Sequence, residues 1–162
     1  MADIESSTQQ EVENNLLDRI LAAESVLVAL RCGDTGMVTS ALRHIALQTG
    51  KALYVWRPRA GLCRLRDHDE RIPGAVELAD VLRLVASNVQ FGVYFLAESP
   101  RAWGPELTAL LRRISQIDPR EPRRLVLSGT LADVPSSLPA RGLAWGSEAG
   151  ARLRLRHGTW SR

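Results

Sequence analysis

The sequence predicts an α/β fold, a three-layer α/β/α sandwich built around a mainly parallel sheet. Short, continuously apolar segments alternate with longer segments whose apolar residues recur every three or four positions, the pattern of strands alternating with amphipathic helices. The clearest apolar segment is residues 91–98, FGVYFLAE, which shows no period of two. Such a strand is typical of a sheet centre that helices cover on both faces. The length of 162 residues matches one domain.

Residues 1–8 are polar and include acidic side chains, and we expect them to form a flexible terminus before a single domain over residues 9–162. A helix is predicted from residue 9 to residue 21, with a buried strand over residues 25–30. Asp34 or Thr35 can cap the next helix, and Gly50 suits a left-handed stop at its end. A second strand is predicted over residues 52–56.

The alternation continues through the second half. We predict an edge strand over residues 62–66, a charged loop over residues 67–71 and a helix over residues 77–85. The central strand over residues 91–98 is followed by a helix over residues 104–114, a buried strand over residues 123–128 and a short extra strand over residues 143–145. Residues 152–157 then alternate with a period of two, so Arg152, Arg154 and Arg156 share one face of a basic terminal strand.

The turn after the first strand is where a phosphate-binding loop is expected. A P-loop has the pattern GxxxxGK[ST], whose lysine reaches the terminal phosphates and whose hydroxyl binds magnesium. This turn supplies Gly33, Asp34, Thr35, Gly36 and Thr39, but it has no lysine, and Asp34 would repel phosphate. We interpret it as a capped helix start, with nucleotide binding without hydrolysis as the alternative.

Glu98 is the other candidate ligand for a nucleotide. It stands where nucleotide-hydrolysing sheets carry the acid that holds magnesium through water, and a solvated carboxylate is the alternative interpretation. No G-x-S-x-G elbow is present, and neither the three histidines nor the two cysteines have metal-ligand spacing. We therefore expect no catalytic residue, no metal and no cofactor.

Arginine supplies nearly all of the positive charge behind the net charge of +3, since Lys51 is the only lysine. The sequence contains an arginine-rich cluster at Arg112-Arg113 and residues 120–124. We expect this cluster to lie beside the carboxyl-terminal half of the sheet, where it could meet an acidic partner. Binding of nucleic acid through the arginine clusters is a second alternative for the function of the chain. Two unpaired cysteines, no signal peptide and no membrane span lead us to expect a cytoplasmic protein.

Residues 50–56, GKALYVW, followed by Gly61-Leu62, Ile72-Pro73-Gly74 and RRLVLSG, carry a family resemblance. The arrangement is similar, over about residues 9–145, to the amino-terminal domain of AAA-type ATPases encoded by a conserved plastid open reading frame and its cyanobacterial and bacterial relatives. The resemblance implies a degenerate RecA-like domain without a Walker A motif, which precedes an ATPase module that these residues do not contain. Glu98 replaces the family's usual aspartate, and the tail after Gly146 has no counterpart.

We therefore expect a non-enzymatic RecA-like domain that binds protein, either by self-association or by docking to a AAA-type or other P-loop ATPase. The expected contacts are Arg57, Arg59 and Trp103 at the strand ends, and the tail arginines, which could extend a partner's sheet. Packing in the core is the alternative for Trp103.

Overall fold

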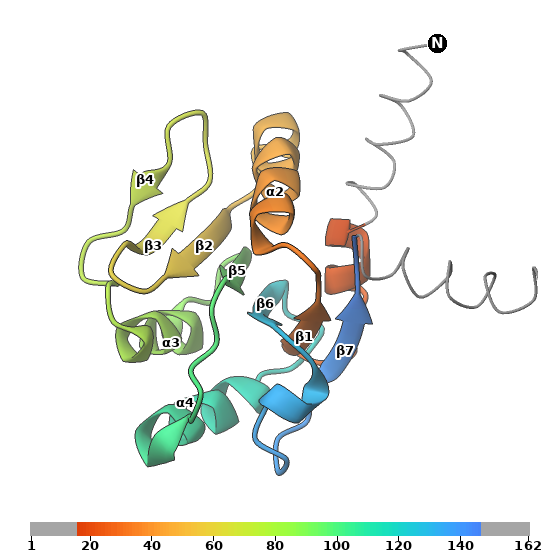
Figure 1. The fold of residues 1–162 in the computed structure, drawn as a ribbon, viewed down its shortest axis with the longest axis vertical. Helices are drawn as coiled ribbons and strands as arrows, with labels where there is room; N and C mark the ends of the chain where they lie inside the picture. The colour runs from red at the N-terminus through yellow and green to blue at the C-terminus, as the bar shows by residue number, and fades with distance from the viewer. Residues whose placement is uncertain (1–15, 147–162) are drawn as a thin grey trace, which may run out of the picture.

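The computed structural model describes residues 16–146. Within them, seven strands form one sheet in the order β4-β3-β2-β5-β6-β1-β7 (Figure 1). The strands are β1 (Leu27–Arg31), β2 (Leu53–Arg57), β3 (Gly61–Arg64), β4 (Glu70–Arg71), β5 (Gly92–Leu96), β6 (Arg123–Ser128) and β7 (Arg141–Ala144). The pairs β2·β5, β5·β6, β6·β1 and β1·β7 are parallel, whereas β3 pairs antiparallel with β2 and β4 with β3. The predicted α/β fold with a mainly parallel sheet is confirmed.

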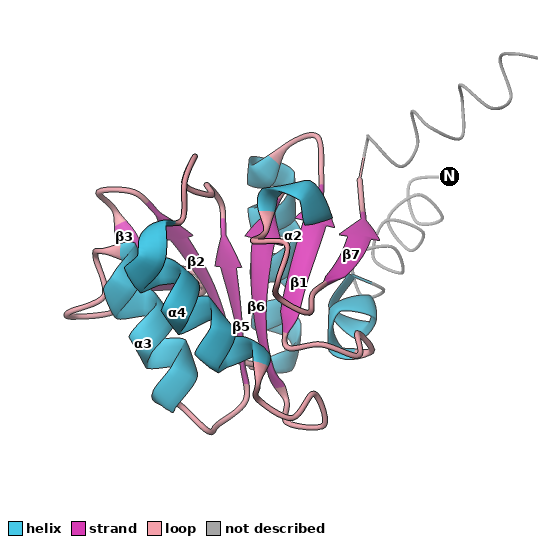
Figure 2. Cartoon of the chain, turned by 90° about the horizontal axis from the view of Figure 1, so that it is seen from below, coloured by secondary structure: helices cyan, strands magenta, loops and turns pink. Residues whose placement is uncertain are grey.

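Helices cover both faces of this sheet (Figure 2). α3 (Leu78–Ser87) and α4 (Gly104–Ser115) lie on one face, and α2 (Thr35–Thr49) with a helical turn over residues 16–21 lies on the other. A short 3₁₀ helix, Leu131–Asp133, follows β6. None of the helices within residues 16–146 is long and apolar enough to span a lipid bilayer.

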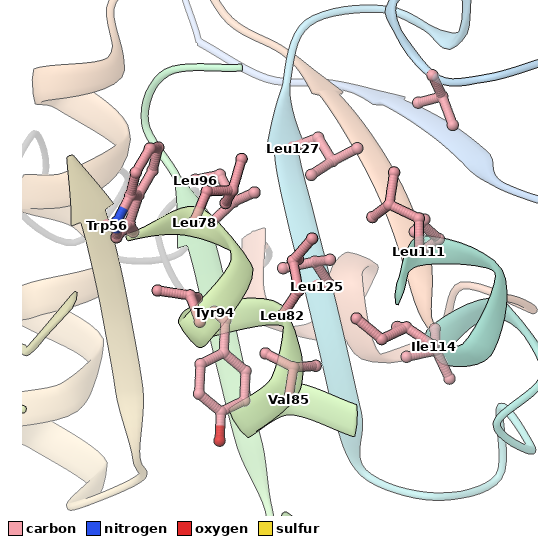
Figure 3. Packing of buried hydrophobic residues seen from close by; sticks show 14 of the residues in the cluster. Trp56, Leu78, Leu82, Val85, Tyr94, Leu96, Leu111, Ile114, Leu125 and Leu127 are labelled. Atoms are coloured by element: carbon pink, nitrogen blue, oxygen red, sulfur yellow. The ribbon is translucent and has the colours of Figure 1, made fainter. Parts of the chain in front are cut away.

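β5 occupies the centre of the sheet, and all five of its residues are buried, as the unbroken apolar segment predicts. Val93 and Phe95 pack toward α2, while Tyr94 and Leu96 pack toward α3 and α4. Figure 3 shows Tyr94 close to Val85 of α3, with its hydroxyl at the end of the cluster. That hydroxyl accepts a hydrogen bond from the Asn88 side chain at 2.8 Å, so the polar atom is satisfied.

The ends of α2 are those that the sequence predicts. Asp34 is the N-cap, and its side chain accepts a hydrogen bond from the backbone N–H of Gly36. Gly50 is the C-cap with a φ of 71°, in the left-handed region where glycine carries no Cβ penalty.

Some element boundaries differ from those predicted. β3 is not an edge strand, because the two-residue strand β4 pairs with it inside the segment predicted to be a charged loop. The last described strand begins at Arg141 rather than residue 143, because it pairs with β1 from Val28 onward. The start of the helix predicted from residue 9 and the predicted strand over residues 152–157 lie outside the described residues.

The placement predicted for the arginine cluster at residues 120–124 was wrong. Arg123 and Arg124 open β6, at the amino end of the strand, and their exposed fractions are only 4% and 3%. Arg123 donates to the carbonyl oxygen of Val85 at 2.9 Å, in the last turn of α3. Arg124 donates to six backbone carbonyl groups, among them those of Ile20 and Leu21. These guanidinium groups satisfy main-chain acceptors at helix ends instead of forming a basic surface.

Candidate functional site

The parallel strands end at one edge of the sheet, and the segments that leave them there form the carboxyl-end surface (upper edge of the sheet in Figure 2). α2 carries the chain from β1 to β2, which lie on opposite sides of β5 and β6. Open α/β sheets bind ligands outside the carboxyl ends of their strands, where such crossovers leave a crevice. The carboxyl-end surface is therefore the candidate site.

The connection from β1 to α2 has three residues, Cys32, Gly33 and Asp34. The Asp34 carboxylate accepts the N–H of Gly36 at 2.8 Å, so a negative charge already occupies the start of the helix. A P-loop instead turns its backbone N–H groups toward phosphate and places a lysine there. The structure thus agrees with the interpretation of this turn as a capped helix start.

Thr39 lies one turn into α2 and is 3% exposed. Its hydroxyl donates to the carbonyl oxygen of Thr35 at 2.8 Å and accepts from the Arg57 guanidinium group at 3.2 Å. Both bonds are internal, so the hydroxyl that would hold magnesium in a P-loop instead links α2 to the end of β2. Of the candidate nucleotide ligands, Thr35 and Glu98 line a common pocket, and Thr39 does not line it.

That pocket, the Arg57 pocket, has a volume of about 420 Å³. It is lined by Thr35, Arg57, Pro58, Arg59, Ala97 and Glu98. It therefore brings together three of the side chains expected to contact a partner or a ligand, namely Arg57, Arg59 and Glu98. All three are exposed.

A second pocket, the Trp103 pocket, has a volume of about 540 Å³ and lies between the segments that follow β5 and β6. It is lined by residues 97–101, Trp103, Ser128 and residues 132–135. Trp103 is 8% exposed, and its indole N–H donates to the carbonyl oxygen of Asp133 at 2.8 Å. This placement favours the packing alternative, because the indole joins α4 to the 3₁₀ helix.

The backbone of Arg59 has a φ of 69°, and it is the one non-glycine residue with positive φ within the described part of the chain. The Arg71 guanidinium group donates to the carbonyl oxygens of Ala60 at 2.9 Å and Arg59 at 3.3 Å, which holds the turn in this conformation. Strained backbone of this kind persists only where its surroundings fix it. Arg59 is thereby held at the rim of the Arg57 pocket.

The residues that carry the family resemblance stabilise the turn between β2 and β3, next to the carboxyl-end surface. The Trp56 indole donates to the carbonyl oxygen of Val76 at 2.8 Å, and the N–H of Leu62 donates to that of Ala75 at 2.8 Å. Gly61 has a φ of 79°, and a Cβ there would lie 3.1 Å from the Ala75 carbonyl oxygen. These contacts attach the segment before α3 to the turn that carries the pocket arginines.

Sequence reasoning missed Pro58, Arg101 and Ser128, which also line the two pockets. For Pro58 and Ser128 the available signal was their position directly after a strand or at its end, whereas Arg101 lies five residues beyond β5 and carried no such signal. Arg152, Arg154 and Arg156 lie outside the described residues. Among residues 16–146, no three side chains of His, Cys, Asp or Glu come together in a group that could hold a metal ion.

The comparison with known families agrees with this architecture. Residues 12–143 match the model of the family described as SpoVK-like AAA ATPase, N-terminal domain. No curated protein and no solved structure matches the chain. The family match covers most of the sequence and confirms the resemblance to AAA ATPase amino-terminal domains that residues 50–62 carry. The chain therefore belongs to the family of SpoVK-like AAA ATPase N-terminal domains.

Proposed function

We propose that this domain is a non-catalytic docking module that binds a AAA-type ATPase through its carboxyl-end surface. The observation that carries the proposal is the bond between Asp34 and the N–H of Gly36, which puts a carboxylate where a RecA-like nucleotide site needs a cation. The family match supports the class of partner, because its members are domains of AAA ATPases. The exposed Arg57, Arg59 and Glu98 then remain available for a protein.

Nucleotide binding is less well supported by this geometry. A triphosphate at the start of α2 would meet the Asp34 carboxylate, and like charges raise its free energy of binding. The neighbouring pocket lined by Thr35 adds the carboxylate of Glu98 beside Arg57 and Arg59. The Thr39 hydroxyl is already bonded within the fold. Binding of nucleic acid through the cluster at residues 120–124 is disfavoured in turn, because Arg123 and Arg124 are buried.

The decisive experiment compares two ligands of the full chain. Binding to a purified SpoVK-like AAA ATPase from the same organism is measured by biolayer interferometry, and binding of Mg²⁺-ATP is measured by isothermal titration calorimetry. We expect saturable binding of the ATPase and no heat from Mg²⁺-ATP. Micromolar Mg²⁺-ATP binding that disappears in Glu98→Ala would overturn the proposal in favour of a nucleotide site.

Self-association is the other form of protein binding that the surface permits, and sedimentation velocity at several concentrations distinguishes it. If the chain forms a dimer and does not bind the ATPase, docking to the ATPase is wrong and self-association takes its place. A monomer that binds neither the ATPase nor itself contradicts protein docking altogether.

A further inference from the structure

We infer that the Arg57 pocket and the Trp103 pocket form one groove, and that this groove binds an extended segment of the partner in which a basic side chain lies between two acidic ones. The inference rests on the proposed function and adds the docking surface and the chemistry of the docked segment.

The two pockets adjoin, because Ala97 and Glu98 line both of them. Arg57 ends β2 on one side, and Ser128 ends β6 on the other. β2, β5 and β6 are neighbours in the sheet, spaced by about 4.8 Å. The groove therefore runs across three strand ends, with Glu98, two residues after the middle strand, at its centre.

The charged side chains along the groove that have no partner within the described residues follow the order positive, negative, positive. Arg57 and Asp133 also line the groove, but Arg57 is bonded to Thr39 and Asp133 to Thr130. Arg59 lies in the Arg57 pocket, Glu98 is shared, and Arg101 lies in the Trp103 pocket. Within residues 16–146, the side chains of these three residues make no hydrogen bond or ion pair. Most charged side chains elsewhere have such partners, as Arg43 has in Asp69 and Arg83 in Glu106. The groove thus presents an ordered set of unpaired charges.

The walls of the groove are fixed by hydrogen bonds within the fold. Ser128 donates to the carbonyl oxygen of Ala97 at 3.0 Å, and Ser99 donates to that of Ser128 at 3.1 Å, so the ends of β5 and β6 are joined twice. The bond from Arg71 to the carbonyl of Arg59 fixes the other end. A surface that is already ordered loses less conformational entropy when a partner binds.

An extended peptide segment is the ligand that fits this order of charges. In an extended chain, side chains two residues apart share one face and are separated by roughly 6.7 Å. A segment with the order acid, base, acid at alternate positions therefore presents three charges of the opposite sign to Arg59, Glu98 and Arg101. Complementary charges of this kind determine register and exclude the wrong partner.

The test uses two fluorescein-labelled peptides with the same composition of small spacers. One contains Glu-Ala-Lys-Ala-Glu and the other contains the swapped order Lys-Ala-Glu-Ala-Lys, and both are titrated with the full chain at low salt by fluorescence anisotropy. We expect the first peptide to bind about tenfold more tightly than the second. In Glu98→Lys, the middle Lys of the first peptide is repelled and the middle Glu of the second is attracted, so we expect the preference to fall to about twofold, the remainder coming from Arg59 and Arg101. Arg113→Glu is the matched control, because Arg113 is an exposed arginine at the end of α4 that does not line the groove, and it should keep the preference.

Equal binding of the two peptides, or an unchanged preference in Glu98→Lys, would overturn the groove as the docking site. Glu98 is exposed and has no partner among the described residues, so its variant should keep the circular dichroism spectrum of the native fold. Measuring the ATPase with the same variant distinguishes the two proposals. If wild type and Glu98→Lys bind the ATPase equally, docking to the ATPase stands and the groove is not the docking site. If the ATPase binds neither wild type nor Glu98→Lys while the peptide preference is observed, only the proposed partner is contradicted.

Discussion

The Asp34 carboxylate accepts a hydrogen bond from the backbone N–H of Gly36 at 2.8 Å, at the start of the helix that follows the first strand. The same place in a P-loop protein holds the phosphates of the nucleotide. Here the charge that stabilises the helix start belongs to the protein itself. A sheet with the parallel order of a nucleotide-binding fold is thus stabilised at this turn without a ligand.

Replacing Asp34 tests this role directly. Asp34→Ala removes the acceptor for the Gly36 N–H, and loss of an N-cap costs about 1 kcal/mol of the free energy of unfolding. Asp34→Asn keeps an acceptor and should stay close to wild type. Urea denaturation followed by circular dichroism measures both changes. If the alanine variant is as stable as the asparagine variant, the bond contributes nothing to the fold.

The buried guanidinium group of Arg124 gives the second prediction. Burial lowers the pKa of Arg124, and its donors bind backbone carbonyl groups of residues 16–23 and of the turn before β6. Arg124→Ala leaves several buried acceptors without a donor, so we expect a loss of about 3 kcal/mol in the free energy of unfolding.

Arg113→Ala is the control for this measurement, since Arg113 is exposed at the end of α4. It should change the free energy by less than about 0.5 kcal/mol. The midpoint of urea unfolding reports both variants. Equal midpoints for Arg124→Ala and Arg113→Ala would contradict a structural role for the buried side chain.

The part of this structure that the sequence predicts is the part that local patterns determine. The apolar segment around Tyr94 and the left-handed stop at Gly50 are properties of neighbouring residues, and both were predicted correctly. Arg124 was expected in a surface cluster that meets an acidic partner, because its acceptor Ile20 is 104 positions away in the sequence. The same reason applies to Trp103, whose partner Asp133 lies in the 3₁₀ helix that follows β6. The strand order was equally inaccessible, because no local pattern specifies which strands pair.

In the candidate site, too, local sequence predicted some features, while others depend on contacts between distant segments. Glu98 was expected at the site because it ends the central strand, and it does line the pocket with Arg57 and Arg59. The contact between the two pockets at Ala97 and Glu98 was not predicted, since it depends on how the ends of β2, β5 and β6 lie next to one another.

A third prediction concerns the pH dependence of stability. The hydrogen bond from the Arg43 side chain holds the pKa of Asp69 below its usual range, although burial partly opposes it. Because the pKa in the folded state is lower than in the unfolded state, the bond stabilises the fold above about pH 4 and is lost as the pH falls through the folded pKa. Asp69→Asn should therefore cost roughly 0.5–1 kcal/mol at pH 7 and less near pH 2.

The measurement is the difference in free energy of unfolding between wild type and Asp69→Asn, determined with urea at both pH values. Asp67→Asn is the control at pH 7, because Asp67 is exposed in the same loop and makes no hydrogen bond or ion pair with a described residue. A difference for Asp69→Asn that stays constant with pH would mean that the carboxylate charge does not stabilise the loop.

The last prediction concerns Gly61 of the family motif, for which Gly50 is a matched control. Both residues have positive φ, 79° and 71°, so alanine is strained at either position. A Cβ at Gly61 would in addition lie 3.1 Å from the Ala75 carbonyl oxygen and from the Val76 Cα, whereas a Cβ at Gly50 meets nothing within 4 Å. We expect Gly50→Ala to cost about 1 kcal/mol and Gly61→Ala about 2–3 kcal/mol. Chemical denaturation measures the loss in each variant, and the difference between the two losses reports the close contact at Gly61, because the backbone strain is common to both. Equal losses would show that the segment before α3 can move away from the turn, and Gly61 would then matter for its backbone conformation alone.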